Sequence, residues 1–172
     1  MYILDPTAEV DLKPISSAPR LKSPDKKIVG LLSNGKAAVS PFFNHLEKML
    51  EKDWNAKTIL RYTKINYSAP ADPDLIRELS RCHMIVTGIG DCGSCSSCSL
   101  HDAITLEKVG SPTVAIMTSE FVDSAKIMAK YCGISDYAFA IVDHPISSAS
   151  DGELEAKARE VLVQAKDLLF QP

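Results

Sequence analysis

Three cysteines lie three residues apart in the segment GIGDCGSCSSCS, which spans residues 88–99. They are Cys92, Cys95 and Cys98, and the acidic residue Asp91 directly precedes the first of them. Cys92 and Cys95 have the C-x-x-C spacing of redox-active pairs, in which two intervening residues permit the backbone approach that a disulfide requires. This spacing indicates thiol chemistry, by redox exchange or nucleophilic attack, or else metal ligation.

The neighbours of Cys92 predict that its thiol lies at the N-terminus of a helix. Gly93 and Ser94 are expected to form a turn before a helix over residues 97–110. Free amide groups and the helix dipole favour a thiolate there, and the Ser94 hydroxyl can donate a hydrogen bond to the sulfur. An ionised Asp91 would oppose the thiolate, so we expect this carboxylate to accept the proton of the Cys92 thiol.

The helical spacing places Cys98 and His101 on one side of the first turn, where His101 can take part in proton transfer. Cys98 alone is equally consistent with a small apolar core residue. Three thiolates at this spacing could instead hold an iron–sulfur cluster, or zinc with His101 as the fourth ligand. The segment lacks the second cysteine group that metal signatures carry, so thiol chemistry is favoured and no cofactor is firmly implied.

The elements that must position these residues alternate between buried strands and helices. Five strand-and-helix units follow one another, with strands expected at 27–33, 57–63, 84–90, 113–119 and 138–143, and helices at 40–53, 72–82, 97–110, 119–133 and 151–170. Most of the strands are apolar throughout, which is typical of a parallel sheet covered on both faces. We therefore predict a single three-layer α/β domain over residues 27–172, with a flavodoxin-like, doubly wound five-stranded sheet in the order 2-1-3-4-5.

This strand order predicts which loops surround the thiols. Ligands of open α/β sheets bind beyond the carboxyl ends of the strands, at the switch point between the first and third strands. Lys36 is equally consistent with an anchor for a substrate carboxylate and with a solvated surface lysine. We expect His144, held by the rigid Pro145, to act as general acid or anion anchor. The predicted substrate-binding residues are Asn34, Lys36, Gly93, Ser94, Ser119 and His144.

Composition narrows the classes of partner. The 172-residue chain carries a net charge of −3, and its Lys and Arg are scattered, so neither nucleic acid nor a membrane surface is expected as a partner. No apolar run approaches the roughly 20 residues of a membrane span, and the acidic start does not resemble a signal peptide. An odd number of cysteines, three of them clustered, differs from a secreted disulfide framework. We expect a cytoplasmic protein that acts on a small molecule.

Residues 1–26 are predicted to form an extended N-terminal arm. They hold four of the ten prolines and no sustained periodicity. Such an arm is ordered only when it docks on its own domain or on a partner subunit. We expect it to pack across a subunit boundary in a homo- or hetero-oligomer with a related subunit.

At the cysteine segment the sequence resembles a known family. GIGDCGSCSSCSLHDAITLEKVGSPTV is similar to the UGSC-motif proteins, in which the first motif position is often selenocysteine followed by Gly-Ser-Cys, and here that position is Cys92. The likeness runs from LDPT through GLLSNGK to DHPI. More distantly, the motif, GSPTVAIMTS and VDHPI resemble the catalytic region of selenoprotein B of the glycine, sarcosine and betaine reductases, with its U-x-x-C-x-x-C pattern.

The resemblance to selenoprotein B implies reductive cleavage of a carbon–nitrogen bond, with Cys92 in place of the selenolate that takes the carbon fragment. Cys95 and Cys98 would correspond to the two following cysteines. A thiolate is a poorer nucleophile and leaving group than a selenolate, which favours a substrate with a better leaving group or a thiol–disulfide role.

We therefore expect a thiol-dependent oxidoreductase that cleaves a C–N, C–S or similar bond of a small substrate. Cys92 is the predicted nucleophile and Cys95 the resolving thiol, and a thioredoxin-like or low-molecular-weight thiol is the predicted reductant. Two alternatives stay open at this point. One is a redox-neutral, cysteine-dependent lyase or transferase, and the other is an iron–sulfur or zinc-binding subunit of a larger complex.

Overall fold

The protein folds around a five-stranded parallel sheet. The structure, a computed structural model, describes residues 15–171. The strands are β1 (Ile28–Ser33), β2 (Thr58–Thr63), β3 (Met84–Gly90), β4 (Thr113–Thr118) and β5 (Ala140–Val142). Their order is β2-β1-β3-β4-β5 and all neighbouring pairs are parallel, so the predicted fold class and strand order are confirmed.

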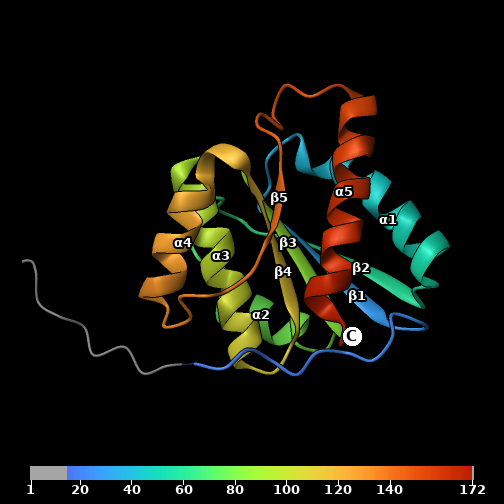
Figure 1. Cartoon of the computed structure of the whole chain (residues 1–172), viewed down its shortest axis with the longest axis horizontal. Coiled ribbons are helices and arrows are strands. Elements are labelled where there is room, and N and C mark those ends of the chain that lie inside the picture. Colours follow the sequence, from blue (N-terminus) through green and yellow to red (C-terminus); the bar gives the residue numbers. More distant parts are fainter. Residues whose placement is uncertain (1–14, 172) are drawn as a thin grey trace, which may run out of the picture.

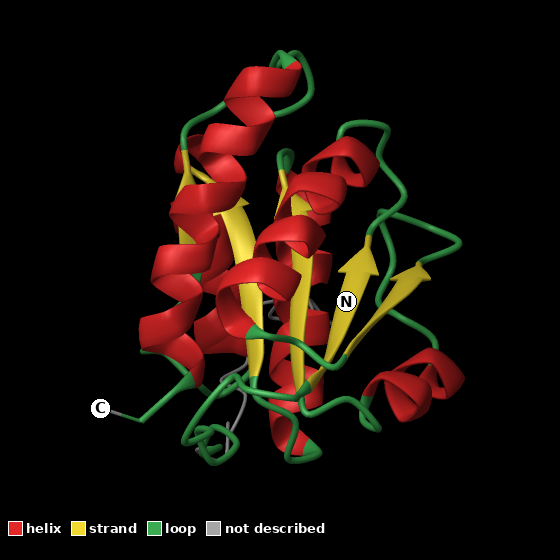
Figure 2. Ribbon diagram, turned by 90° about the vertical axis from the view of Figure 1, so that its right-hand side faces the viewer, coloured by secondary structure: helices red, strands yellow, loops and turns green. Residues whose placement is uncertain are grey.

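Helices cover both faces of this sheet. They are α1 (Val39–Trp54), α2 (Pro73–Leu79), α3 (Gly93–Lys108), α4 (Val122–Tyr131) and α5 (Asp151–Leu169). Helices α1 and α5 pack together on one face, and α2, α3 and α4 lie on the other (Figure 1). Figure 2, seen from the side of α1 and α5, shows helices in front of the strands and running roughly along them. None of the helices within residues 15–171 combines the length and apolar character that crossing a membrane requires.

The central strands are buried along their whole length. Every residue of β3 and of β4 is buried, whereas most of the edge strand β2 is exposed. The largest apolar cluster lies between the sheet and the helices α1 and α5, and it includes Phe42, Leu46 and Val161. Burial of one such side chain contributes about 1.5–3 kcal/mol. The apolar strands thus provide a rigid base whose carboxyl edge carries the polar loops.

Strand β5 and the start of helix α4 differ from the prediction. Strand β5 spans only Ala140–Val142 instead of residues 138–143, because it pairs with just the last three residues of β4. Helix α4 begins at Val122, since Ser119–Phe121 form a short 3-10 turn rather than the first turn of the helix. Both differences lie near the carboxyl edge of the sheet.

The described part of the predicted arm docks on its own domain. It runs along the end of the molecule where the C-terminus also lies (Figure 1), and Leu21 pairs with Phe170 in an isolated β-bridge. The buried Glu107 carboxylate accepts hydrogen bonds from the backbone N–H of Ala18 at 2.6 Å and from Arg20 Nη1 at 2.9 Å. Residues 1–14 of the arm lie outside the described residues, so the expected subunit contact stays a prediction.

Candidate active site

The first turn of helix α3 packs directly against the carboxyl end of β3. A Cβ atom at Gly90, the last residue of β3, would lie 2.9 Å from Ser96 Cα and closer still to Met117 Sδ. Real Cβ atoms essentially never approach backbone atoms so closely, which makes glycine necessary at this position. The missing side chain lets the first turn of α3 pack against the strand and fixes where the cysteine segment leaves the sheet.

Helix α3 begins at Gly93, four residues earlier than predicted. Cys92 is its N-cap, and the Cys92 sulfur accepts a hydrogen bond from the Cys95 backbone N–H at 3.3 Å. The expected turn before the helix is therefore wrong, because Gly93 and Ser94 belong to the first helical turn. Packing outweighs the low helix propensity of this segment, since small side chains such as that of Ser96 are fully buried.

Cys92 and Cys95 form a disulfide, with their Cα atoms 5.4 Å apart. The two residues differ in burial, because Cys95 is 0% exposed and Cys92 is only half-buried. The Ser94 hydroxyl lies 3.7 Å from the Cys92 sulfur, within the range in which it can stabilise a sulfur anion. The site therefore has one sulfur that a reactant can reach and a second sulfur buried behind it.

Asp91 contacts His144 instead of the neighbouring thiol. The buried Asp91 carboxylate lies 3.0 Å from His144 Nδ1 and also accepts a hydrogen bond from the Ile146 backbone N–H at 3.3 Å. Because an ionised carboxylate can only accept hydrogen bonds, this contact assigns the imidazole proton to Nδ1. Nε2 lies on the opposite side of the ring, and within residues 15–171 it has no hydrogen-bond partner.

Residues at the end of β4 hold the His144 ring in place. Thr118 Oγ1 donates to the Gly90 carbonyl and lies 3.1 Å from His144 Nδ1. Ser119 Oγ accepts a hydrogen bond from the His144 backbone N–H at 3.2 Å, and the Phe121 ring packs edge-on against the imidazole. The predicted substrate residue Ser119 thus contacts His144 directly, and the ends of β3, β4 and β5 meet at this ring.

A buried ion pair behind the cysteine helix was not predicted from the sequence. Lys64, which follows β2, lies with its Nζ 2.6 Å from Asp102 Oδ2, and both side chains are almost completely buried. Asp102 Oδ1 also accepts a hydrogen bond from the Ala71 backbone N–H at 2.7 Å. The pair therefore fixes both ends of the segment 64–71 against α3. A lysine directly after a strand, at the edge where ligands bind, is the sequence signal that could have pointed to it.

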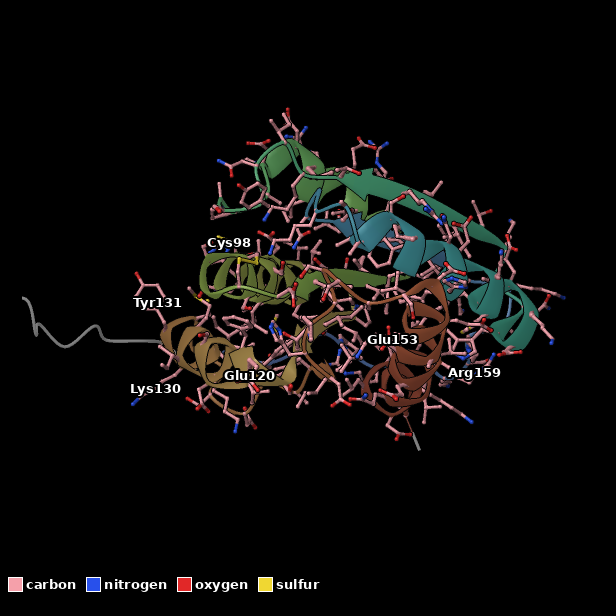
Figure 3. All side chains as sticks on the ribbon, turned by 90° about the horizontal axis from the view of Figure 1, so that it is seen from above. Cys98, Glu120, Lys130, Tyr131, Glu153 and Arg159 are labelled. Atoms are coloured by element: carbon pink, nitrogen blue, oxygen red, sulfur yellow. A yellow bond between two sulfur atoms is a disulfide. The ribbon has the colours of Figure 1, made fainter. Side chains whose placement is uncertain are left out.

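Cys98 and His101 follow the disulfide along α3, about one and nearly two helical turns after Cys95. Cys98 is a half-buried free thiol (Figure 3). Burial raises the pKa of Cys98, the Lys64 ammonium lowers this pKa in part, and the Asp102 carboxylate raises it. His101 follows Cys95 by six residues, about 9 Å along the helix axis, and its nearest charged neighbour is Asp102 at 3.8 Å. The structure thus places Cys98 and His101 beside the buried pair of Lys64 and Asp102.

The loop after β1 contains the other predicted binding residues. Asn34 is buried, and its side-chain amide donates to the Ile89 carbonyl at 2.8 Å while its oxygen accepts from the Lys36 backbone N–H at 3.3 Å. Asn34 therefore connects this loop to β3 and positions Lys36.

Within residues 15–171, no group of three or more His, Cys, Asp or Glu side chains is placed to hold a metal ion.

Fold and site together describe a three-layer α/β protein with a disulfide at the N-terminus of a helix and an Asp–His pair beside it. A model of the UGSC family matches residues 2–171. The chain therefore belongs to the UGSC family, as the motif at Cys92 predicted. None of the curated proteins matches the chain.

The contact between α3 and β3 predicts that Gly90→Ala destabilises the protein. The added Cβ would meet the Ser96 backbone at 2.9 Å, which forces the first turn of α3 to shift. We expect a loss of about 1–3 kcal/mol in the free energy of unfolding, measured by urea denaturation. Gly93→Ala is the matched control, because a Cβ there meets nothing within 4 Å. Equal stability of the two variants would contradict the proposed contact.

The unequal burial of the thiols predicts that Cys92 of the reduced protein reacts first with limiting iodoacetamide. Burial raises the pKa values of Cys82, Cys98 and Cys132, so each of these thiols forms less thiolate at neutral pH. Fragment-ion mass spectrometry of the alkylated peptides locates the label. Earlier labelling of Cys82 or Cys132 would disprove the assignment of Cys92 as the reactive thiol.

Proposed function

We propose that the protein is a thiol-dependent reductase that cleaves a bond of a small substrate with the Cys92–Cys95 pair. The unequal burial of the two bonded residues carries this proposal, because a half-buried sulfur can attack a substrate while a fully buried one can only react within the protein. Membership of the UGSC family, and the resemblance of the motif to selenoprotein B of the glycine, sarcosine and betaine reductases, support cleavage of a C–N, C–S or similar bond.

The proposed reaction has two steps. The Cys92 thiolate first forms a bond to the electrophilic atom of the substrate, and the leaving group departs with the bonding electron pair. The Cys95 thiolate then attacks the Cys92 sulfur, and the substrate fragment leaves with its electron pair and takes up a proton. The two thiols lose two electrons as they form the disulfide, and the substrate gains them.

In this scheme His144 Nε2 takes up the proton that the Cys92 thiol releases and passes it to the departing substrate fragment. Its Nδ1 is held by Asp91, so Nε2 exchanges protons with the reacting groups, as in other Asp–His pairs beside a nucleophile. The role first predicted for Asp91, direct proton transfer from Cys92, is therefore replaced by orientation of His144. Hydrogen bonding of the Cys92 sulfur by the Cys95 N–H and the Ser94 hydroxyl would favour the attacking thiolate.

An external thiol returns the two electrons to the disulfide. Cys95 is completely buried, so an external thiol cannot reach its sulfur. The reductant therefore has to attack Cys92 and release Cys95 as the leaving thiolate. A second thiol of the same reductant then resolves the mixed disulfide. A thioredoxin-like protein or a low-molecular-weight dithiol meets this requirement.

The proposed resolving role of Cys95 predicts how the reduced protein reacts with an aromatic disulfide such as dithiobis(nitrobenzoic acid). In the wild type, Cys92 displaces one thionitrobenzoate and Cys95 then displaces the second, which leaves the internal disulfide and no adduct. Cys95→Ser should release one equivalent from this site and keep the other on Cys92, where mass spectrometry detects it.

Two variants control this experiment. Cys132→Ser, at the end of α4, should behave as the wild type, and Cys92→Ser should show neither the fast release nor the adduct. A wild-type protein that retains the adduct would favour the redox-neutral lyase or transferase and contradict the reductase. Loss of the adduct from Cys95→Ser would show that Cys95 is not the resolving thiol.

A further inference from the structure

A cavity of about 260 Å³ lies beside the Asp–His pair, on the side of the sheet that α1 covers. Its walls come from the loop after β1, the start of α1, the end of β3 and the segment after β5. The lining includes Lys36, Val39, Ile89, Asp91, Ile146 and Ser147. Three loops at the carboxyl edge of the sheet therefore enclose one small space.

The cavity combines apolar walls with a lysine that has no ion-pair partner in the part of the chain that the structure describes. Val39, Ile89 and Ile146 are buried aliphatic residues. The Asp91 carboxylate is engaged by His144 Nδ1 at 3.0 Å and by the Ile146 backbone N–H at 3.3 Å, whereas Lys36 makes no ion pair with any residue in the range 15–171. A ligand in this space therefore meets the free ammonium group of Lys36 and a short aliphatic surface, beside an Asp91 carboxylate that is already hydrogen-bonded.

The first turn of α1 adds to the positive potential at this end of the cavity. Helix α1 has 16 residues, its N-cap residue Ala38 provides no side-chain hydrogen bond, and its first turn contains no acidic residue. The positive end of the helix dipole is consequently not offset by a local carboxylate. Lys36 and the start of α1 would thus both attract a bound anion.

We propose that this cavity binds the carboxylate group of a small, short-chain substrate, with Lys36 as its anchor. The inference rests on the proposed function, because it places the substrate beside Asp91, which precedes Cys92 and orients His144. The volume lies below the roughly 300–1,000 Å³ typical of pockets for drug-sized ligands, so it fits a small metabolite. The aliphatic walls fit the short carbon chain of such a molecule.

Two alkylating reagents of nearly equal size test this proposal. Iodoacetate carries a carboxylate and iodoacetamide does not, and both react by the same step, in which the Cys92 sulfur bonds to the methylene carbon and iodide leaves with the electron pair. The measured quantity is the ratio of the two rate constants at Cys92 of the reduced protein. Lys36→Gln should lower the ratio of iodoacetate to iodoacetamide about tenfold, as expected for the loss of about 1.4 kcal/mol of selective binding.

Two further variants separate a specific anchor from a general charge effect. Lys36→Arg keeps the charge and should retain most of the wild-type ratio. Lys48→Gln removes an exposed lysine from the surface of α1 and should leave the ratio unchanged. Circular dichroism and the urea midpoint verify that each variant is folded.

The outcomes distinguish the two proposals. An unchanged ratio in Lys36→Gln, or an equal fall in Lys48→Gln, would overturn the carboxylate site while Cys92 is still the labelled thiol. Labelling at another cysteine in the wild type would instead overturn the role of Cys92, and with it the placement of the substrate beside this residue.

Discussion

The site depends on the close contact between the end of β3 and the first turn of α3. Because Gly90 has no side chain, the helix backbone can approach the strand, which places Cys92 at the N-cap and Cys95 one turn inside the helix. The same contact makes the Gly90 carbonyl available to Thr118 Oγ1 at 3.1 Å, and Thr118 in turn lies next to His144. One backbone approach thus sets the geometry of the thiols and of the imidazole together.

Two buried carboxylates lie near this contact, and each has a partner side chain. On the side of α1, the Asp91 carboxylate is paired with His144 and serves its orientation. On the side of α2, Asp102 is paired with Lys64 and holds the segment 64–71 against α3. Removing one partner would leave a buried carboxylate without its contact, which is costly, so His144 and Lys64 each support the fold as well as the site. Lys36 is different, because its charge has no partner within residues 15–171.

The sequence predicted the sheet well because the strands are apolar and regularly spaced, and the strand order then placed the loops of His144 and Lys36 at the edge with Cys92. It did not predict the start of α3, since glycine and serine have low helix propensity and only packing on β3 makes them helical. The partner of Asp91 was also missed, because His144 lies 53 positions away (144 − 91) and nothing local indicates the pairing. For the same reason the pairing of Lys64 with Asp102 appears only in three dimensions.

A redox titration of the wild-type protein tests the central claim most directly. The protein is equilibrated with mixtures of reduced and oxidised dithiothreitol, quenched, alkylated after denaturation, and mapped by fragment-ion mass spectrometry. The proposed function predicts that Cys92 and Cys95 lose their label together in a single two-electron transition, while Cys82, Cys98 and Cys132 stay alkylated throughout. A fully oxidised protein in which Cys92 is still a free thiol, or is bonded to a cysteine other than Cys95, would contradict it.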